Sequence, residues 1–318
     1  MERNKFVRLP DLGRLMAHGT AYLCHKNFLI VKSTIPFHQK ILRFWNHLPL
    51  LLRAGISGFL VSTIGVSFWA ADLQLIPLPW AIVAMLIPLW WYLKFFSGSG
   101  RAGQYAKIRR IRFRAVKLSS KAWAWGLAGG ILFVVVVQAS FVLTFRIIRM
   151  PPAFASGYPI IDTLPVWLAW LTIIMASVVA GICEETGFRG YMQVPIEKRY
   201  GSILSILFVS VIFSLIHLTK VWAIPIIPNI FFASVLLGIL AVRTNSLLPG
   251  IIGHSILDVF DYSFWWTHFS GKWERQTIFK TGPDMHFLFW CLIFLGGLGG
   301  FFWSMSKLAR DPVKLGDN

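Results

Sequence analysis

The chain has 318 residues, of which 56% are hydrophobic and only 14% charged, whereas soluble domains carry about a quarter charged residues. This composition excludes an ordinary soluble domain and indicates a membrane protein. The net charge of +18 would suit a nucleic-acid partner, but the Lys and Arg residues form no base-reading module, so none is expected.

The first segment, residues 1–48, is basic and moderately apolar. We expect it to be partly helical and to lie on the anionic inner surface of the membrane, or else to be a solvated flexible tail. Of the 31 Lys and Arg residues, nine precede Ala54 and nine more lie between Lys94 and Lys121, a stretch without an acidic residue. The positive-inside rule places both basic stretches in the cytoplasm.

Eight apolar runs follow, each near the length of about 20 residues that crosses a bilayer. Lipid offers no partners to backbone groups, and no dyad alternation suggests a barrel, so the runs must be helices. We therefore predict an all-α polytopic bundle of about eight transmembrane helices over residues 49–305, followed by a cytoplasmic tail at 306–318. The runs are approximately Ala54–Ala71, Ile76–Leu93, Ala122–Ile148, Val166–Cys183, Ser202–His217, Trp222–Val242, Leu247–Trp266 and His286–Met305.

Counting the spans from the two basic stretches gives their orientation. It places both termini and the connection after Cys183 in the cytoplasm, and a short turn at Ala71–Leu75 outside. Pro225 and Pro228 interrupt the sixth run, where we expect a kink in the helix. We expect an integral protein of a bacterial inner membrane or plasma membrane.

Ionisable residues within the runs are few, and their cost in a bilayer makes them informative. An acidic pair and an arginine follow the fourth run, a histidine ends the fifth, and three residues lie in the seventh. They are Glu184, Glu185, Arg189, His217, His254, Asp258 and Asp261.

Helix spacing assigns different tasks to the two glutamates. Glu185 and Arg189 lie four residues apart and can form an intrahelical ion pair. Glu184 points about 100° away from Glu185 and lacks that partner. We therefore predict a structural role for Glu185 and a functional one for Glu184. His254 and Asp258, again four residues apart, share one helix face.

Two kinds of hydrolytic chemistry suit a free carboxylate, two imidazoles and a further carboxyl group. Glu184, His217, His254 and Asp258 can hold a divalent metal such as zinc, with an open position for water. Alternatively, Glu184 acts as general base for a water molecule while the other groups stabilise the oxyanion. Both interpretations lead to hydrolysis.

Three motifs in order along the chain, EETGFR at 184–189, FSLIH at 213–217 and HSILD at 254–258, carry a family resemblance. They resemble the EExxxR, FxxxH and Hxxx-Asn/Asp motifs of the CPBP intramembrane proteases, also called the Abi or type II CAAX prenyl endopeptidase family. The resemblance covers about 166–266, within a catalytic core at about 160–266.

The resemblance implies an endopeptidase with a cavity in the helix bundle, where a membrane-associated or prenylated-type peptide or protein is cleaved. Glu184 would activate water, His217 would help hold it, and His254 with Asp258 would stabilise the oxyanion, with the ion pair of the first motif in support. This requires Glu184 and His217 to lie at one depth, whereas span counting sets His217 nearer the outer face. The role of a metal stays open.

Asp258 stands where the family also has Asn. An amide can donate a hydrogen bond to an oxyanion, whereas an ionised Asp258 can only accept one. Asp258 must then be protonated, orient His254 or bind a metal. We interpret Asp261 as a satisfied or supporting polar group, and Cys183 as a small apolar filler rather than a nucleophile.

Two other classes of function stay open. One is a non-proteolytic scaffold or immunity protein that binds a partner membrane protein. The other is a cation or proton transporter, because buried Glu, His and Asp residues also build relays. Transporters usually show inverted repeats, which are not visible in this sequence. The intact motifs favour the peptidase.

Overall fold

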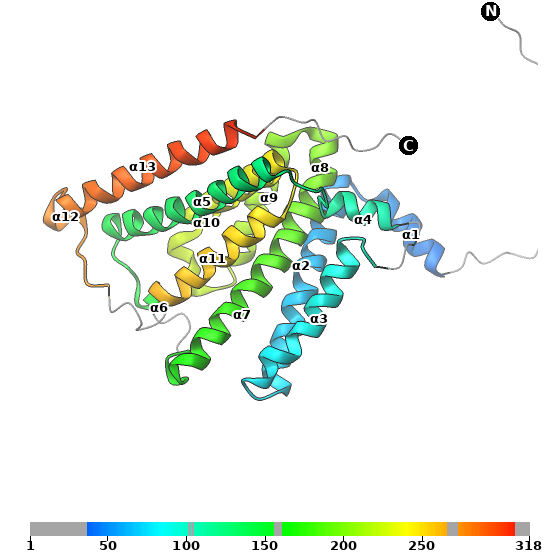
Figure 1. Cartoon of the computed structure of the whole chain (residues 1–318), viewed down its shortest axis with the longest axis horizontal. Helices are drawn as coiled ribbons and strands as arrows, with labels where there is room; N and C mark the ends of the chain where they lie inside the picture. Colours follow the sequence, from blue (N-terminus) through cyan, green and yellow to red (C-terminus); the bar gives the residue numbers. More distant parts are fainter. Residues whose placement is uncertain (1–36, 101–102, 104, 156–160, 266–272, 309–318) are drawn as a thin grey trace, which may run out of the picture. The chain divides into compact units, whose positions relative to one another are not determined.

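The computed structural model describes residues 37–100, 103, 105–155, 161–265 and 273–308 (Figure 1). The chain divides into two units, Met1–Asn46 and His47–Asn318. The first unit holds most of α1 (Phe37–His47), a helix with exposed Phe44. Residues 1–36 of the predicted basic segment lie outside the described residues. The helices from α2 onward belong to the second unit.

Each of the eight apolar runs coincides with a helix, and the described residues contain helices and no strand. The all-α prediction is therefore confirmed. The long helices are α2 (Leu50–Leu75), α3 (Trp80–Phe96), α5 (Ser120–Ile147), α7 (Val166–Glu184), α9 (Ser202–His217), α10 (Ile227–Thr244), α11 (Leu248–Trp265) and α13 (Met285–Ser306). The short helices are α4 (Ala106–Arg112), α6 (Pro152–Ala155), α8 (Gln193–Tyr200) and α12 (Ile278–Thr281), with 3-10 turns at Ile161–Thr163 and Val221–Ile226 and a π-helix at Glu185–Met192.

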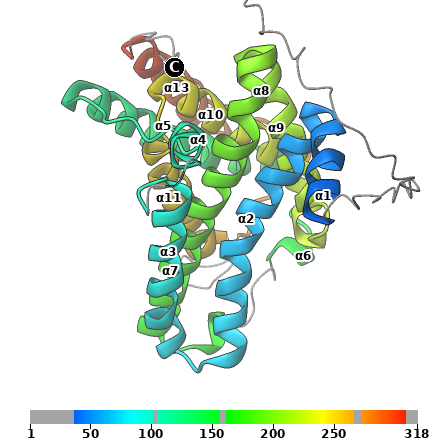
Figure 2. The same cartoon turned by 90° about the vertical axis from the view of Figure 1, so that its right-hand side faces the viewer.

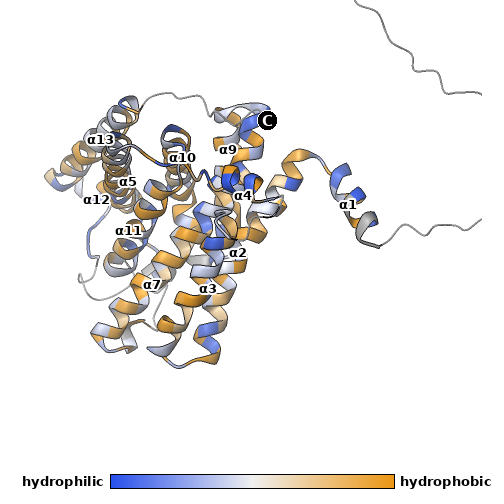
Figure 3. Ribbon diagram, turned by 45° about the vertical axis from the view of Figure 1, so that its right-hand side comes forward, coloured by the Kyte–Doolittle hydropathy of each residue, from blue (hydrophilic) through white to orange (hydrophobic). Residues whose placement is uncertain are grey.

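All the long helices except α11 have the length or apolar composition of membrane spans. Five helical stretches of the described chain are long and apolar enough to cross a bilayer, and α3 and α9 are apolar but shorter. Figure 3 shows mostly hydrophobic ribbon along α2, α3 and α7, against hydrophilic residues on α4. Large side chains such as Ile203 and Leu292 are exposed, which suits contact with lipid rather than water. The chain is an integral membrane protein.

Three boundaries differ from the prediction. Ala71–Leu75 is not a turn, because α2 continues to Leu75 and the chain turns only at the prolines that follow. The fourth span does not end at Cys183, because the helix continues without a break through the π-helix and α8 to Tyr200. In the sixth run, the expected kink is not present within one helix, because Val221–Ile226 forms a 3-10 turn and α10 begins only at Ile227.

Helix α11 packs between α5 and α7 and forms the centre of the second unit (Figure 1). The crossing of α7 and α11 depends on Gly181. A methyl group at that position would lie 2.3 Å from Ser255 Oγ and 3.0 Å from the carbonyl oxygen of Ile251. Small residues let two membrane helices approach closely, so Gly181 sets the distance between the segments that carry the first and third motifs.

Helices α2, α3 and α7 run side by side (Figure 2), and α2 also packs on the π-helix. There the contact is backbone to backbone: a methyl group at Gly187 would lie 2.5 Å from the carbonyl oxygen of Gly58. Cys183 is buried, and its side chain fills the space beside Gly65. This packing agrees with the interpretation of Cys183 as a filler.

Candidate active site

The first motif lies in a widened stretch of helix. From Glu185 to Met192 the backbone is π-helical, between the regular turns of α7 and α8. Pro195 follows shortly, and its ring has no N–H to donate and excludes the carbonyl four residues earlier, at Tyr191. The turns before Pro195 therefore cannot all be regular α-helix, and π-helical turns are frequent at functional sites.

Glu185 joins two of the motifs. Its Oε1 lies 3.1 Å from Arg189 Nη1, which confirms the predicted pair four residues apart. The same oxygen lies 2.9 Å from His254 Nδ1. The carboxylate and the guanidinium are both fully buried, so the pair shields two charges that would otherwise be costly at this depth. The contact with His254 was not predicted, because helix spacing gives no information about neighbouring helices.

His254 faces two further carboxyl groups with its other nitrogen. Its Nε2 lies 3.8 Å from Glu184 Oε2 and 3.7 Å from Asp258 Oδ1. The side chains of Glu184 and Asp258 are 19% and 21% exposed, against 8% for His254. The two carboxyl groups are thus the accessible members of the cluster. The Nδ1 contact to Glu185 orients the ring, as partners of functional imidazoles commonly do.

His217 joins the cluster from α9. Its Nδ1 lies 2.8 Å from the carbonyl oxygen of Phe213 and donates to it, which leaves Nε2 free to accept a hydrogen bond in the neutral ring. The ring of Phe213 packs against both histidines, with its centroid 4.8 Å from that of His217 and 6.4 Å from that of His254. Arg189 stacks on the same ring at 4.7 Å. All three motifs therefore meet.

The depth of His217 follows from the corrected boundary of the fourth span. Because that helix runs on to Tyr200 before the chain turns at Gly201, α9 starts well beyond Glu184 and runs back past it. His217, at the end of α9, then lines the same cavity as His254 and Asp258. The separation in depth that span counting gave for Glu184 and His217 is therefore wrong.

A cavity of about 90 Å³ lies at this meeting point. That volume has room for more than one water molecule. His217, His254, Asp258 and Asp261 supply its polar wall, and Glu184 reaches the cluster through its contact with His254. The remaining wall is apolar and consists of Phe133, Val137, Phe141, Phe213, Ile226, Ile230, Ala233, Leu237 and Leu257.

The carboxylate of Asp261 is hydrogen-bonded to a side chain of α5. Gln138 of α5 donates from Nε2 to Asp261 Oδ1, and its Oε1 accepts a hydrogen bond of 3.0 Å from Trp265 Nε1. Asp261 is buried, and the contact agrees with its interpretation as a satisfied supporting group. Trp265, at the end of α11, is 5% exposed and packs in the core.

The predicted metal site depends on how the donor atoms of the cluster are arranged. Among the described residues, no group of three or more His, Cys, Asp or Glu side chains is arranged to hold a metal ion. Within the cluster, His254 Nδ1 is occupied by Glu185, and Nε2 is 3.7 to 3.8 Å from the carboxyl oxygens. Zinc ligands lie about 2.0–2.2 Å from the metal, so two donor atoms on one ion lie about 3–4 Å apart, and the separations of 3.7 and 3.8 Å fall in that range. The metal site therefore stays a prediction.

Comparison with known families identifies the segment that carries the motifs. Residues 165–260 match the family model described as type II CAAX prenyl endopeptidase Rce1-like, which confirms the resemblance seen in the three motifs. No curated protein and no solved structure matched the chain. At the level of the family, the match supports a CAAX-type intramembrane protease, which implies a lipid bilayer and a peptide or protein substrate.

Proposed function

We propose that this chain, with its Rce1-like segment at 165–260, is an intramembrane endopeptidase that hydrolyses a peptide bond with a water molecule activated by Glu184. The substrate class is a membrane-associated or prenylated-type peptide or protein. One observation carries the proposal: Glu184 and Asp258 both face His254 Nε2, at 3.8 and 3.7 Å, beside a cavity that His217 also lines.

Glu184 has the geometry of a general base. The gap between its Oε2 and His254 Nε2 is too long for a direct hydrogen bond and suits a bridging water. Glu184 takes a proton from this water as the oxygen attacks the carbonyl carbon, and later returns it to the leaving amine as the C–N bond breaks. General base catalysis of this kind contributes about 10²- to 10⁴-fold to the rate.

The two histidines have different roles in this mechanism. His217 donates from Nδ1 to its own helix, so its Nε2 lone pair can accept a hydrogen bond from the attacking water. His254 donates from Nδ1 to Glu185. In its imidazolium form it also donates from Nε2, and this second N–H can stabilise the oxyanion of the tetrahedral intermediate.

Asp258 completes the oxyanion site in its protonated form. Its Oδ1 lies 3.7 Å from His254 Nε2, so both groups can reach one oxygen atom between them. A neutral carboxylic acid donates one hydrogen bond, as an amide would at this position, whereas a carboxylate would repel the developing charge. Asp258→Asn would therefore keep the donor and Asp258→Ala would remove it.

The test uses the full-length protein purified in detergent and a peptide library that includes farnesylated and unmodified C-terminal peptides. Glu184→Gln and Glu184→Ala are compared with Asp72→Asn, which makes the same chemical change near the end of α2, away from the site. We expect cleavage by the parent and by Asp72→Asn, and loss of at least 100-fold in both Glu184 variants.

Parallel measurements distinguish the remaining classes of function. Metal analysis of the purified protein, with cleavage assayed before and after chelation, tests the metal prediction. Folded Glu184 variants that keep full biological activity would support a scaffold. Glu184-dependent ion flux in liposomes without hydrolysis of any peptide would support a transporter. Either result would refute the peptidase.

A further inference from the structure

A second group of cations lies at the other end of α5. The stretch Lys94–Lys121 precedes the start of α5, and the positive-inside rule makes the opposite end of a span poor in Lys and Arg. At that opposite end, however, four basic side chains gather from the end of α5 and the segment before α13. They are Arg146, Arg149, Arg275 and Lys280.

Arg146 has a structural explanation. Its Nη2 donates to Asp284 Oδ2 at 2.8 Å and to Thr281 Oγ1 at 3.0 Å, and its Nη1 lies 3.1 Å from His286 Nδ1. The guanidinium is buried. Arg146 therefore fastens the start of α13 to the end of α5 and is neutralised by Asp284.

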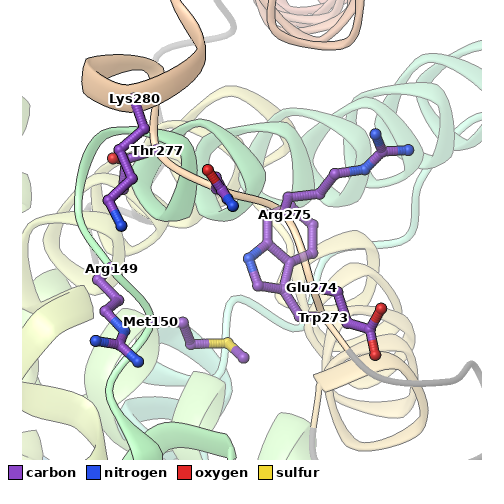
Figure 4. A pocket seen from close by; sticks show the side chains of 8 residues that line it. Arg149, Met150, Trp273, Glu274, Arg275, Thr277 and Lys280 are labelled. Atoms are coloured by element: carbon purple, nitrogen blue, oxygen red, sulfur yellow. The ribbon is translucent and has the colours of Figure 1, made fainter.

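Arg149 and Lys280 have no such explanation. Within the described part of the chain, neither charged group has an ion-pair or hydrogen-bond partner. Both line a pocket of about 420 Å³ between the end of α5 and the segment 273–280. Figure 4 shows them on the same side of this pocket, while the carboxylate of Glu274 points away from them.

The pocket offers further hydrogen-bond donors. Trp273 lines it, and its Nε1 is buried without a hydrogen-bond partner in the described structure. The Gln276 amide and the Thr277 hydroxyl are also among the lining groups. A buried N–H without a partner is costly. Two cations without a partner among the described residues, beside the unsatisfied Trp273 N–H, are groups that suit an anion with several oxygen atoms, of which phosphate is the best match.

Exposed apolar side chains near the lining residues in the chain indicate where the phosphate comes from. Phe279, next to Lys280, is 81% exposed, Ile147, two residues before Arg149, is 44% exposed, and Met285 at the start of α13 is 79% exposed. The pocket lies near the ends of α5 and α13, two helices long and apolar enough to span a bilayer, and headgroups flank the hydrocarbon core at the ends of such spans. A free anion would gain nothing from these exposed apolar groups, whereas a lipid would cover them with its acyl chains.

We propose that the pocket between Arg149 and Lys280 binds the phosphate of an anionic phospholipid headgroup. The proposal does not depend on the protease activity. Each basic group near an anionic headgroup adds about 1 kcal/mol, or about fivefold in affinity. Removal of both charges should therefore weaken binding about 25-fold.

The test uses the delipidated full chain in detergent and native mass spectrometry with added phosphatidylglycerol or phosphatidylcholine. The variant Arg149→Gln/Lys280→Gln is compared with Lys117→Gln/Lys121→Gln, which removes the same charge at the start of α5. A charge-conserving variant, Arg149→Lys/Lys280→Arg, controls for local packing. In a second arm, calorimetry measures binding of sodium phosphate against sodium chloride at equal ionic strength.

We expect one tightly retained phosphatidylglycerol in the parent and in the two control variants, and about 25-fold weaker retention in Arg149→Gln/Lys280→Gln. Phosphatidylcholine should bind weakly throughout, and inorganic phosphate should show no binding above chloride. Phosphate binding without lipid retention would overturn the lipid source. Equal lipid retention in Arg149→Gln/Lys280→Gln and the parent, or equal loss in the two double Gln variants, would overturn the site.

Discussion

Glu185 provides the sharpest test of how the site is held together. It contacts Arg189 at 3.1 Å and His254 at 2.9 Å, and both members of the ion pair are fully buried. At an effective dielectric constant of about 20, two charges 3.1 Å apart attract by about 5 kcal/mol. The remaining hydrogen-bond partners of Arg189 are Ser234 Oγ at 3.0 Å and the Ser234 carbonyl at 3.4 Å, and neither these nor the Phe213 ring carries a charge that neutralises the guanidinium.

Glu185→Gln should therefore leave an uncompensated buried guanidinium and lower the free energy of unfolding by about 3–5 kcal/mol. The double variant Glu185→Leu/Arg189→Met removes both charges and should recover the stability to within about 1 kcal/mol of the parent. It cannot recover the acceptor for His254 Nδ1, so we expect its cleavage rate to stay about 10²- to 10⁴-fold below that of the parent.

Unfolding by titration with sodium dodecyl sulfate, followed by circular dichroism, measures the stabilities, and the peptide assay measures the activity. Glu274→Gln is the matched control, because it makes the same chemical change at an exposed side chain that forms no ion pair among the described residues. A Glu185→Gln variant as stable as the control would refute the burial argument. A double variant with full activity would refute the orienting role of Glu185.

Three further predictions concern packing, the oxyanion site and pH. Gly181→Ala should cost about 1–3 kcal/mol and reduce cleavage by forcing α7 and α11 apart. Gly55→Ala, within α2 and with no atom within 4 Å of the added methyl group, should instead leave the stability unchanged or raise it by up to about 1 kcal/mol in the same unfolding assay. Asp258→Asn should retain cleavage to higher pH than the parent, because an amide cannot ionise, and Asp258→Ala should lose activity. Profiles of the cleavage rate against pH measure both effects. Identical profiles for Asp258→Asn and the parent would contradict the proposal that Asp258 acts in its protonated form. The Arg146 guanidinium lowers the pKa of Asp284, so this pair stabilises the fold at pH values above the ordinary carboxyl pKa of about 4, and the stabilisation is lost as the pH falls below that value. Asp284→Asn should therefore reduce the fall of the unfolding midpoint temperature at acid pH. An unchanged dependence of the midpoint temperature on pH would refute this role of the pair.

The fold class could be predicted because the bilayer restricts the options. Apolar runs of span length can only be helices where backbone groups have no water to bond, and all eight runs coincide with helices. The residues at which these helices end could not be predicted on the same ground. Nothing in composition distinguishes a helix that stops at Cys183 from one that continues to Tyr200, because the polar residues after Cys183 are the kind that usually mark a loop.

The sequence by itself determined which side chains are candidates for the site and which pair within a helix meets. The spacing of four residues predicted the Glu185–Arg189 pair, and the three motifs carried the family resemblance, because both depend only on order along the chain. The tertiary structure alone decided that Glu185 also holds His254, that the π-helix and α9 bring His217 to the same cavity, and that Gln138 holds Asp261. These contacts depend on the distance and rotation between helices, which close packing at residues such as Gly181 sets and which no periodicity within one helix records.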